Sequence, residues 1–194
     1  MSLTDFIRGA RPANFQDKTD AMMVGSVRGQ DVQFRNFLAG WVNIADGQYT
    51  AGSPRAITGG SKTQITIDGL GATTRTDYAD GLHPNVWLNN RFTPRFLGET
   101  YNLRLTLVAT QTTSGSGHYV TFEADIGTDE TPFIAATQSI PLIKGQGVPT
   151  VITIAAPFFC LETFALRGAR LFLTPDVDIS IHSAAIFIQR TFTP

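Results

Sequence analysis

Tyr101-Asn-Leu-Arg-Leu-Thr-Leu-Val108 is the stretch of sequence that decides the fold of this chain. Its odd-numbered positions are all apolar, whereas Asn102, Arg104 and Thr106 lie between them. Such a period of two is typical of a β-strand with one face buried and the other in water. Similar short runs, separated by turns rich in Gly, Pro and Ser, continue to the last residue. The pattern predicts an all-β fold, an antiparallel, jelly-roll-like β-sandwich.

The alternation also predicts the strands and the core of this sandwich. No helix is expected after the first thirty residues, and 112–117 is expected to join two strands as a hairpin. The expected strands are 32–38, 41–44, 63–68, 73–78, 85–88, 101–111, 118–126, 133–140, 150–155, 169–173, 177–181 and 184–192. The expected core includes Ile65, Ile67, Leu103, Leu105, Leu107, Val120, Phe122, Ile152, Ile154 and Ile179.

The first thirty residues differ from the rest, so the chain divides into an N-terminal arm, 1–30, and a sandwich body, 31–194. Pro12 prevents one long helix in the arm. The apolar residues of the arm are spaced too widely to build a core of their own. We therefore expect them to bind the surface of a partner; they are Phe6, Ile7, Phe15, Met22 and Met23.

Composition excludes several classes of function. The net charge is −1, and no long run of one charge occurs, so neither nucleic acid nor an anionic membrane is an expected partner. No run approaches the eighteen or so apolar residues of a membrane span. The first residues lack the basic and apolar regions of a secretory signal, so a cytosol-like compartment is expected, with release by assembly or lysis. Charged residues make up only 16% of the chain, which favours permanent protein contacts.

Residues that could perform chemistry are few. Cys160 is the only cysteine and lies among apolar residues, which predicts a buried side chain rather than a nucleophile or a disulfide. His83, His118 and His182 are far apart in the sequence and have no ligand spacing for zinc. No metal or other cofactor is therefore expected, and no enzymatic activity.

Acidic and aromatic residues receive structural interpretations for the same reason. Asp125, Asp129 and Glu130 do not follow a calcium-loop spacing and predict a solvated turn. Asp176 and Asp178 share one face of an extended backbone and need separate partners. Trp41 and Trp87 predict core or interface aromatics rather than a platform for sugar stacking.

The last strand has apolar residues on both faces, which favours a subunit contact. Ile186, Ile188 and Phe192 oppose Ala185, Phe187 and Thr191. We predict a homotrimer whose interface contains Ile186, Ile188, Arg190 and Phe192, with Arg190 paired to a carboxylate or a carbonyl.

An arm followed by a Thr- and Gly-rich jelly-roll body and a last strand that runs almost to the terminus resembles the trimeric structural proteins of tailed-bacteriophage virions. The resemblance is strongest to head decoration (cement) proteins and related fibre modules. It implies a protein made in the host cytoplasm and located on the capsid surface of the virion. Its partners would then be further copies of itself and the major capsid protein or another virion protein.

Two alternatives from other classes remain open. A receptor- or glycan-binding module of a phage tail fibre would expose Trp or Tyr around a pocket. A β-sandwich polysaccharide hydrolase or lyase would bring carboxylates and His together in one cleft, for example His83 and His118 within hydrogen-bond reach of an Asp.

Overall fold

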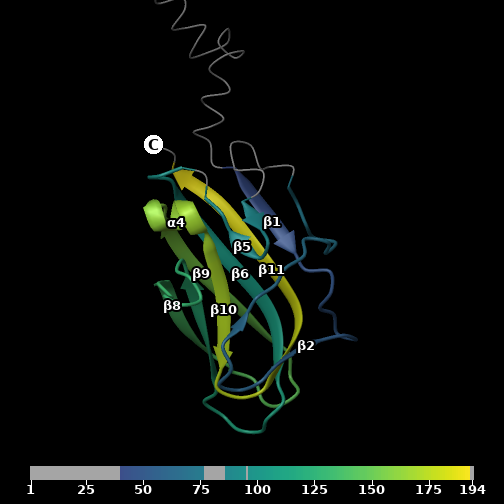
Figure 1. Ribbon diagram of the computed structural model, residues 1–194. Helices are drawn as coiled ribbons and strands as arrows, with labels where there is room; N and C mark the ends of the chain where they lie inside the picture. The colour runs from purple at the N-terminus through teal and green to yellow at the C-terminus, as the bar shows by residue number, and fades with distance from the viewer. Residues whose placement is uncertain (1–39, 77–85, 95, 193–194) are drawn as a thin grey trace, which may run out of the picture.

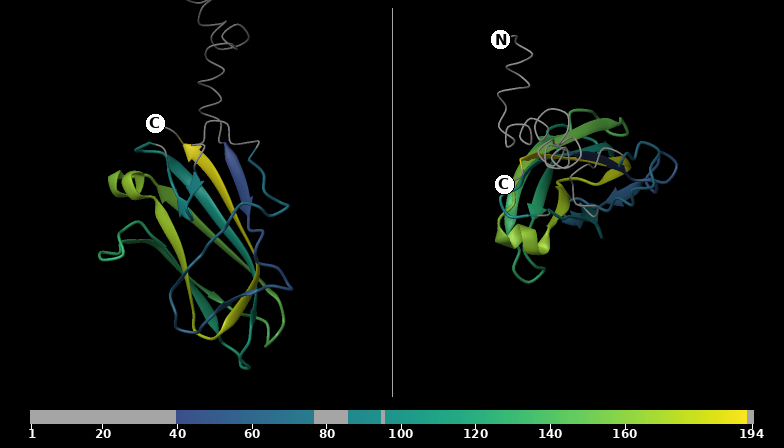
Figure 2. Two further views of the ribbon diagram at one scale, coloured as in Figure 1. Left: turned by 45° about the vertical axis from the view of Figure 1, so that its right-hand side comes forward. Right: turned by 90° about the horizontal axis from the view of Figure 1, so that it is seen from above.

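The computed structural model of the protein describes residues 40–76, 86–94 and 96–192 (Figure 1). The predicted arm, with Phe6, Ile7, Phe15, Met22 and Met23, and the predicted strand 32–38 lie outside the described residues, as does His83. The body that follows is a sandwich of two antiparallel sheets, as the alternating pattern predicts (Figures 1 and 2).

Each sheet is built around strands distant in the sequence. The first sheet has the order β1 (Trp41–Ala45), β11 (Ile179–Phe192), β6 (Thr100–Gln111), β9 (Thr150–Phe159), and β2 (Arg55–Ile57) also pairs with β11. The second sheet has the order β4 (Trp87–Leu88), β5 (Arg91–Phe92), β10 (Ala169–Pro175), β7 (Tyr119–Asp125), β8 (Ile134–Pro141), and β3 (Thr63–Gln64) pairs with β10.

The strand orders β1-β11-β6-β9 and β10-β7-β8 are those of a jelly roll, in which the chain passes repeatedly from one sheet to the other. The predicted hairpin through 112–117 is therefore wrong. Both edges of β6 are already paired, with β11 and with β9, so β7 joins the other sheet beside β10. Alternation reveals which face of a strand is buried, but it does not reveal which strand lies beside it.

The core lies between the two sheets, and the prediction of its residues is confirmed. All ten predicted core residues are at most 2% exposed. Phe92 lies at the centre of an aromatic cluster, with ring centroids 5.1 Å from those of Tyr101 and Phe164 and 5.5 Å from that of Phe158. This cluster fills one end of the sandwich, the end at which α4 (Glu162–Arg167) lies (Figure 1).

The expectation of no helix beyond residue 30 is wrong at α4. The helix has only six residues, too few for a clear helical period in the sequence. Phe164 holds it against Phe92 and Phe158, and Gly168 ends it with a φ of 67°. None of the helices in the described ranges is long and apolar enough to cross a membrane.

Several other boundaries differ from the prediction: the strand expected at 63–68 is reduced to Thr63–Gln64, and the strand expected at 150–155 extends to Phe159. The segments 177–181 and 184–192 belong to a single strand, β11, with a register shift between Ile181 and Ser183. The predicted strand 73–78 is reduced to an isolated bridge between Asn43 and Arg75 in its described part.

Candidate interaction surface

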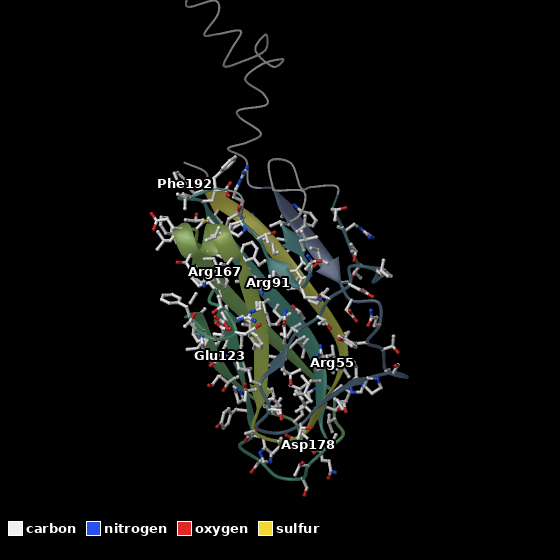
Figure 3. The ribbon with its side chains drawn as sticks, in the orientation of Figure 1. Arg55, Arg91, Glu123, Arg167, Asp178 and Phe192 are labelled. Atoms are coloured by element: carbon white, nitrogen blue, oxygen red, sulfur yellow. The ribbon has the colours of Figure 1, made fainter. Side chains whose placement is uncertain are left out.

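Strand β11 buries three of the four residues that the sequence favours as an interface. Ile186 and Ile188 are 0% exposed and Arg190 is 3% exposed, because this face of β11 packs against the second sheet of the same chain. These three side chains are thus covered within one copy. This corrects the prediction, which required them to lie on the surface. Phe192 is 51% exposed and lies at the end of the body near α4, as Figure 3 shows for Phe192 and Arg167.

Arg190 does have a carboxylate partner, but it lies in the same chain. Its Nη1 is 3.2 Å from Oε1 of Glu99, which is 0% exposed. The other oxygen of Glu99 accepts hydrogen bonds from the Tyr101 hydroxyl at 2.5 Å and from the Phe96 N–H at 2.8 Å. This buried pair therefore fixes the end of β11 to β6 rather than to another subunit.

Strand β9 carries the exposed apolar face instead. It forms the edge of the first sheet, and its residues alternate strictly between buried and exposed. The outward residues include Val151, 64% exposed, and Phe159, 56% exposed. Both faces of β9 are apolar in the sequence, the same pattern that predicted a subunit contact for β11, so the pattern was sufficient to single out β9 as well.

The exposed apolar residues concentrate in one segment of the chain, which contains β8, β9 and α4. Of the large apolar side chains that are exposed in the described part of the chain, eight of fourteen belong to the segment 133–166. These eight residues form what we call the apolar flank: Phe133, Ile134, Ile143, Val148, Val151, Phe159, Leu161 and Leu166. The same segment contains only two charged residues, Lys144 and Glu162. Its strands β8 and β9 and its helix α4 lie along one side of the sandwich (Figure 1).

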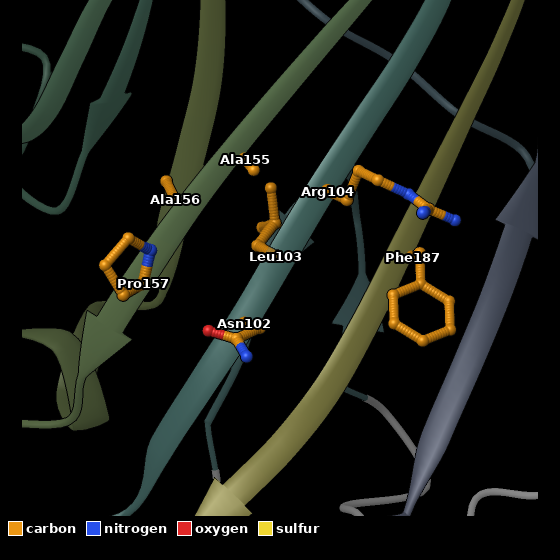
Figure 4. Close-up of a pocket in the computed structure, with 7 residues that line it drawn as sticks. All are labelled: Asn102, Leu103, Arg104, Ala155, Ala156, Pro157 and Phe187. Carbon is orange, nitrogen blue, oxygen red and sulfur yellow. The ribbon is translucent and has the colours of Figure 1, made fainter.

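The outer face of the first sheet contains a hollow of about 420 Å³ (Figure 4). Its lining is Asn102, Leu103 and Arg104 of β6, Ala155, Ala156 and Pro157 of β9, and Phe187 of β11. The register explains the hollow, because Arg104 is flanked by the small Ala155 on one side and by Phe187 on the other. The Cζ of Arg104 lies 5.1 Å from the ring centroid of Phe187, a cation–π contact.

Aromatic residues extend this face towards β1. The ring of Trp41 lies 5.5 Å from that of Phe187, so Trp41 belongs to the outer face. Trp87 instead packs against the core and donates a hydrogen bond from its Nε1 to the Ile67 carbonyl at 3.0 Å. Cys160 is 0% exposed, and burial, together with the nearby Glu99, raises the pKa of its thiol to about 11. The predicted burial of Cys160 and the predicted packing of Trp87 against the core are confirmed.

His118 and His182 occupy separate positions in the structure. Nδ1 of His118 lies 3.2 Å from Oδ2 of Asp176, and Nε2 of His182 lies 2.9 Å from the Thr110 hydroxyl. His118 therefore meets one part of the condition set for a hydrolase, a contact with an Asp, while His83 lies outside the described residues. Asp178 has its own partner, the Gly59 N–H at 2.7 Å, so the two neighbouring aspartates are stabilised separately.

The acidic turn of the second sheet is an ion-pair network. Asp125 is buried, contrary to the predicted solvated turn, and its carboxylate contacts Nη2 of Arg170 at 2.9 Å, while Asp129 contacts Nη1. Burial alone raises the pKa of Asp125, but hydrogen bonds from the Phe133 and Gly127 N–H groups and the charge of Arg170 outweigh it and lower the pKa. Across the residues that the structure describes, no group of three or more His, Cys, Asp or Glu could hold a metal ion.

No protein-family model and no curated protein sequence matches this chain. Among solved structures, a TNF protein, Eiger from S. frugiperda, is similar with a TM-score of 0.47 and 11% identity over 79% of this chain and 92% of that one. The vertex protein P5 of PRD1 is similar with a TM-score of 0.46 and 14% identity over 80% of this chain and 73% of that one. The VP2 protein of infectious bursal disease virus has a TM-score of 0.40 and 11% identity over 78% of this chain and 32% of that one. At these TM-scores and identities, the likenesses do not assign a function.

Proposed function

We propose that this protein is a structural component of a virus particle, specifically a decoration (cement) protein on the outer surface of a phage head. The observation that carries this proposal is the apolar flank, which leaves eight large apolar side chains exposed beside only two charges. Monomeric soluble proteins rarely expose such clusters, which mark protein–protein contacts. The layout of an arm before a jelly-roll body, which resembles phage decoration proteins, supports the virion as the place of assembly.

The proposal includes a homotrimer with no catalytic role. Interfaces that hold subunits together permanently are large and apolar, and the flank has this chemistry. Residues 1–30 would attach the trimer to the capsid through Phe6, Ile7, Phe15, Met22 and Met23. Burying each apolar anchor contributes roughly 1.5–3 kcal/mol, so single anchors should matter.

A second candidate function is a glycan-binding module of a tail fibre. The hollow on the outer face favours it, because Arg104, Asn102 and the ring of Phe187 meet there and Trp41 lies beside them. Aromatic rings beside polar side chains are the usual composition of a small-ligand site. A glycan array probed with the full chain distinguishes this function from a cement role.

Purified virions of the virus that encodes the chain provide the test of the main proposal. Mass spectrometry is expected to detect the protein in the particles, and electron microscopy is expected to locate it on the outer surface of the head. Particles that lack the protein should lose their genome at a lower temperature, and adding back the purified full chain should restore their stability. Phe15→Ala should reduce this add-back, with Glu130→Arg, an exposed acid of the body, as the control.

Two outcomes would contradict the proposal. The protein could be absent from purified particles, or it could be found only on the tail. If Phe15→Ala bound to particles at wild-type occupancy, the attachment surface would lie in the sandwich rather than in the arm.

A further inference from the structure

In the described part of the chain, the strands β1, β6, β9 and β11 carry a single unpaired positive charge on the outer face of the first sheet. Among the outward residues of β1, β6, β9 and β11, Arg104 is the only Lys, Arg, Asp or Glu. Its guanidinium contacts the ring of Phe187, and no carboxylate of the described residues pairs with it. Arg104 is exposed and carries five N–H donors, so a partner that covers this face must supply acceptors for them.

The apolar flank has one unpaired negative charge. Glu162 is the only acid in the segment 133–166, lies in the first turn of α4 and is exposed, and no cation of the described residues pairs with it. Two apolar side chains close to it in the chain are largely exposed: Leu161, which precedes it, is 60% exposed, and Leu166, four residues later, is 80% exposed. The other charge of the flank, Lys144, donates a hydrogen bond to the Pro149 carbonyl at 2.9 Å.

We propose that the α4 end of the apolar flank of one copy docks on the outer face of a second copy, with Glu162 of the first paired to Arg104 of the second. Leu161 and Leu166 supply the apolar side chains, and the hollow beside Ala155 and Pro157 receives them. The occupant is a second copy because one chain carries both halves of a matched surface, apolar protrusions with one acid and an apolar hollow with one base.

Such a contact joins two different surfaces, so it is head-to-tail. A head-to-tail contact closes into a ring when the rotation between copies permits it, and a threefold ring is the smallest beyond a dimer. This inference deepens the proposed function and rests on its homotrimer, because it names the two surfaces that meet. It also relocates the interface from the buried face of β11 to β9, β6 and α4.

Charge reversal of the full chain, read by light scattering, tests the pairing. The wild type is expected at about 63 kDa, three times the chain mass of 21.1 kDa. Arg104→Glu and Glu162→Arg should each weaken association at least about 10-fold, because charge pairs across interfaces are strongly coupled. The double variant, in which the two charges are exchanged, should recover most of the association. Glu130→Arg reverses an exposed acid outside the flank and should leave the mass unchanged.

Ala155→Phe gives a second reading that does not depend on charge. A phenyl group there fills the hollow, so it should weaken association while circular dichroism stays that of a β-sandwich. A monomeric wild type at micromolar concentration, or single reversals that the double variant fails to rescue, would overturn the inference. Glycan binding that Ala155→Phe abolishes while the trimer persists would likewise overturn it and assign the hollow to a carbohydrate. The cement role is read separately, from add-back to particles, so a trimer that fails to bind particles rejects only that role.

Discussion

Strands β9 and β11 flank the same central strand, β6, and both have apolar residues on each face, yet they meet different surroundings. β11 lies inside the sheet between β1 and β6, and its inward Ile186 and Ile188 are completely buried. β9 lies at the edge, and its outward Val151 and Phe159 are more than half exposed. The inward faces of both strands are buried, so the contrast lies in their outward faces: that of β11 is mostly half-buried beside the side chains of β1 and β6, whereas the edge position of β9 leaves its outward residues exposed.

The ion pair at the end of β11 should give the largest loss of stability. Replacing Arg190 with Met removes the guanidinium that lies 3.2 Å from the Glu99 carboxylate, which is 0% exposed. Breaking a buried pair in this way costs about 3–5 kcal/mol of unfolding free energy. Urea unfolding at a fixed chain concentration measures it, with Arg91→Met, a cation of the second sheet, as the control.

The same experiment has a built-in cross-check. A Glu99→Gln, Arg190→Met double variant should lose less than the sum of the single losses, because the charge left behind is removed as well. Additive losses would contradict a direct pair and would turn attention back to a contact between subunits.

The buried face of β11 should come next in size. Ile186→Ala removes apolar volume that the second sheet encloses, and such changes cost about 2–5 kcal/mol. Differential scanning calorimetry of the full chain should show a lower midpoint of unfolding. A loss below about 0.5 kcal/mol would mean that the face is solvated in the free chain, as the original interface prediction requires.

Local pattern predicted the core of this protein well, and particular residues show why. Leu103, Leu105 and Leu107 alternate with polar residues, and burial of one face is a property of the strand alone. Strand order is different, because the pairing of β6 with β9 and β11 joins residues about 50 and 80 positions apart, and no local signal encodes it. The hairpin through 112–117 was wrong for this reason, and so was the expectation that Ile186, Ile188 and Arg190 are left uncovered within one copy. The outer hollow depends on the same register, which places Ala155 beside Arg104.

The charged centre of the second sheet offers a contrast with the charge-poor flank. The pKa of Asp125 is lowered in the folded chain from its ordinary value of 3.8. A carboxyl group whose pKa is lower in the folded chain than in the unfolded chain stabilises the fold at pH values above its unfolded pKa. This stability is lost as the pH falls through its folded pKa. The free energy of unfolding should therefore decline below about pH 4.

Asp125→Asn tests this pH dependence. The variant should lose about 1.5–3 kcal/mol at pH 7, since Arg170 loses a charged hydrogen-bond acceptor. Its stability should then vary less between pH 4 and pH 2 than that of the wild type. Asp68 also has a lowered pKa, so part of the decline in unfolding free energy at low pH should remain in both the wild type and the variant. An unchanged acid profile in Asp125→Asn would remove Asp125 as its source.

The outward face of β9 should show the smallest effect on folding. Val151 is 64% exposed, so Val151→Ser removes few contacts within one copy, and exposed substitutions usually change stability by less than about 0.5 kcal/mol. The measurement belongs in the Arg104→Glu background, where the chain is expected to be monomeric and unfolding is not coupled to dissociation.

In the wild-type background the same change should weaken self-association, because it replaces an apolar contact of the flank with a hydroxyl group. Ile186→Ala in both backgrounds is the matched control from β11, and it should lower stability equally in each. If Val151→Ser lowered the stability of the monomer as much as Ile186→Ala, the outward face of β9 would be covered within one copy, and the distinction between the two strands would fail.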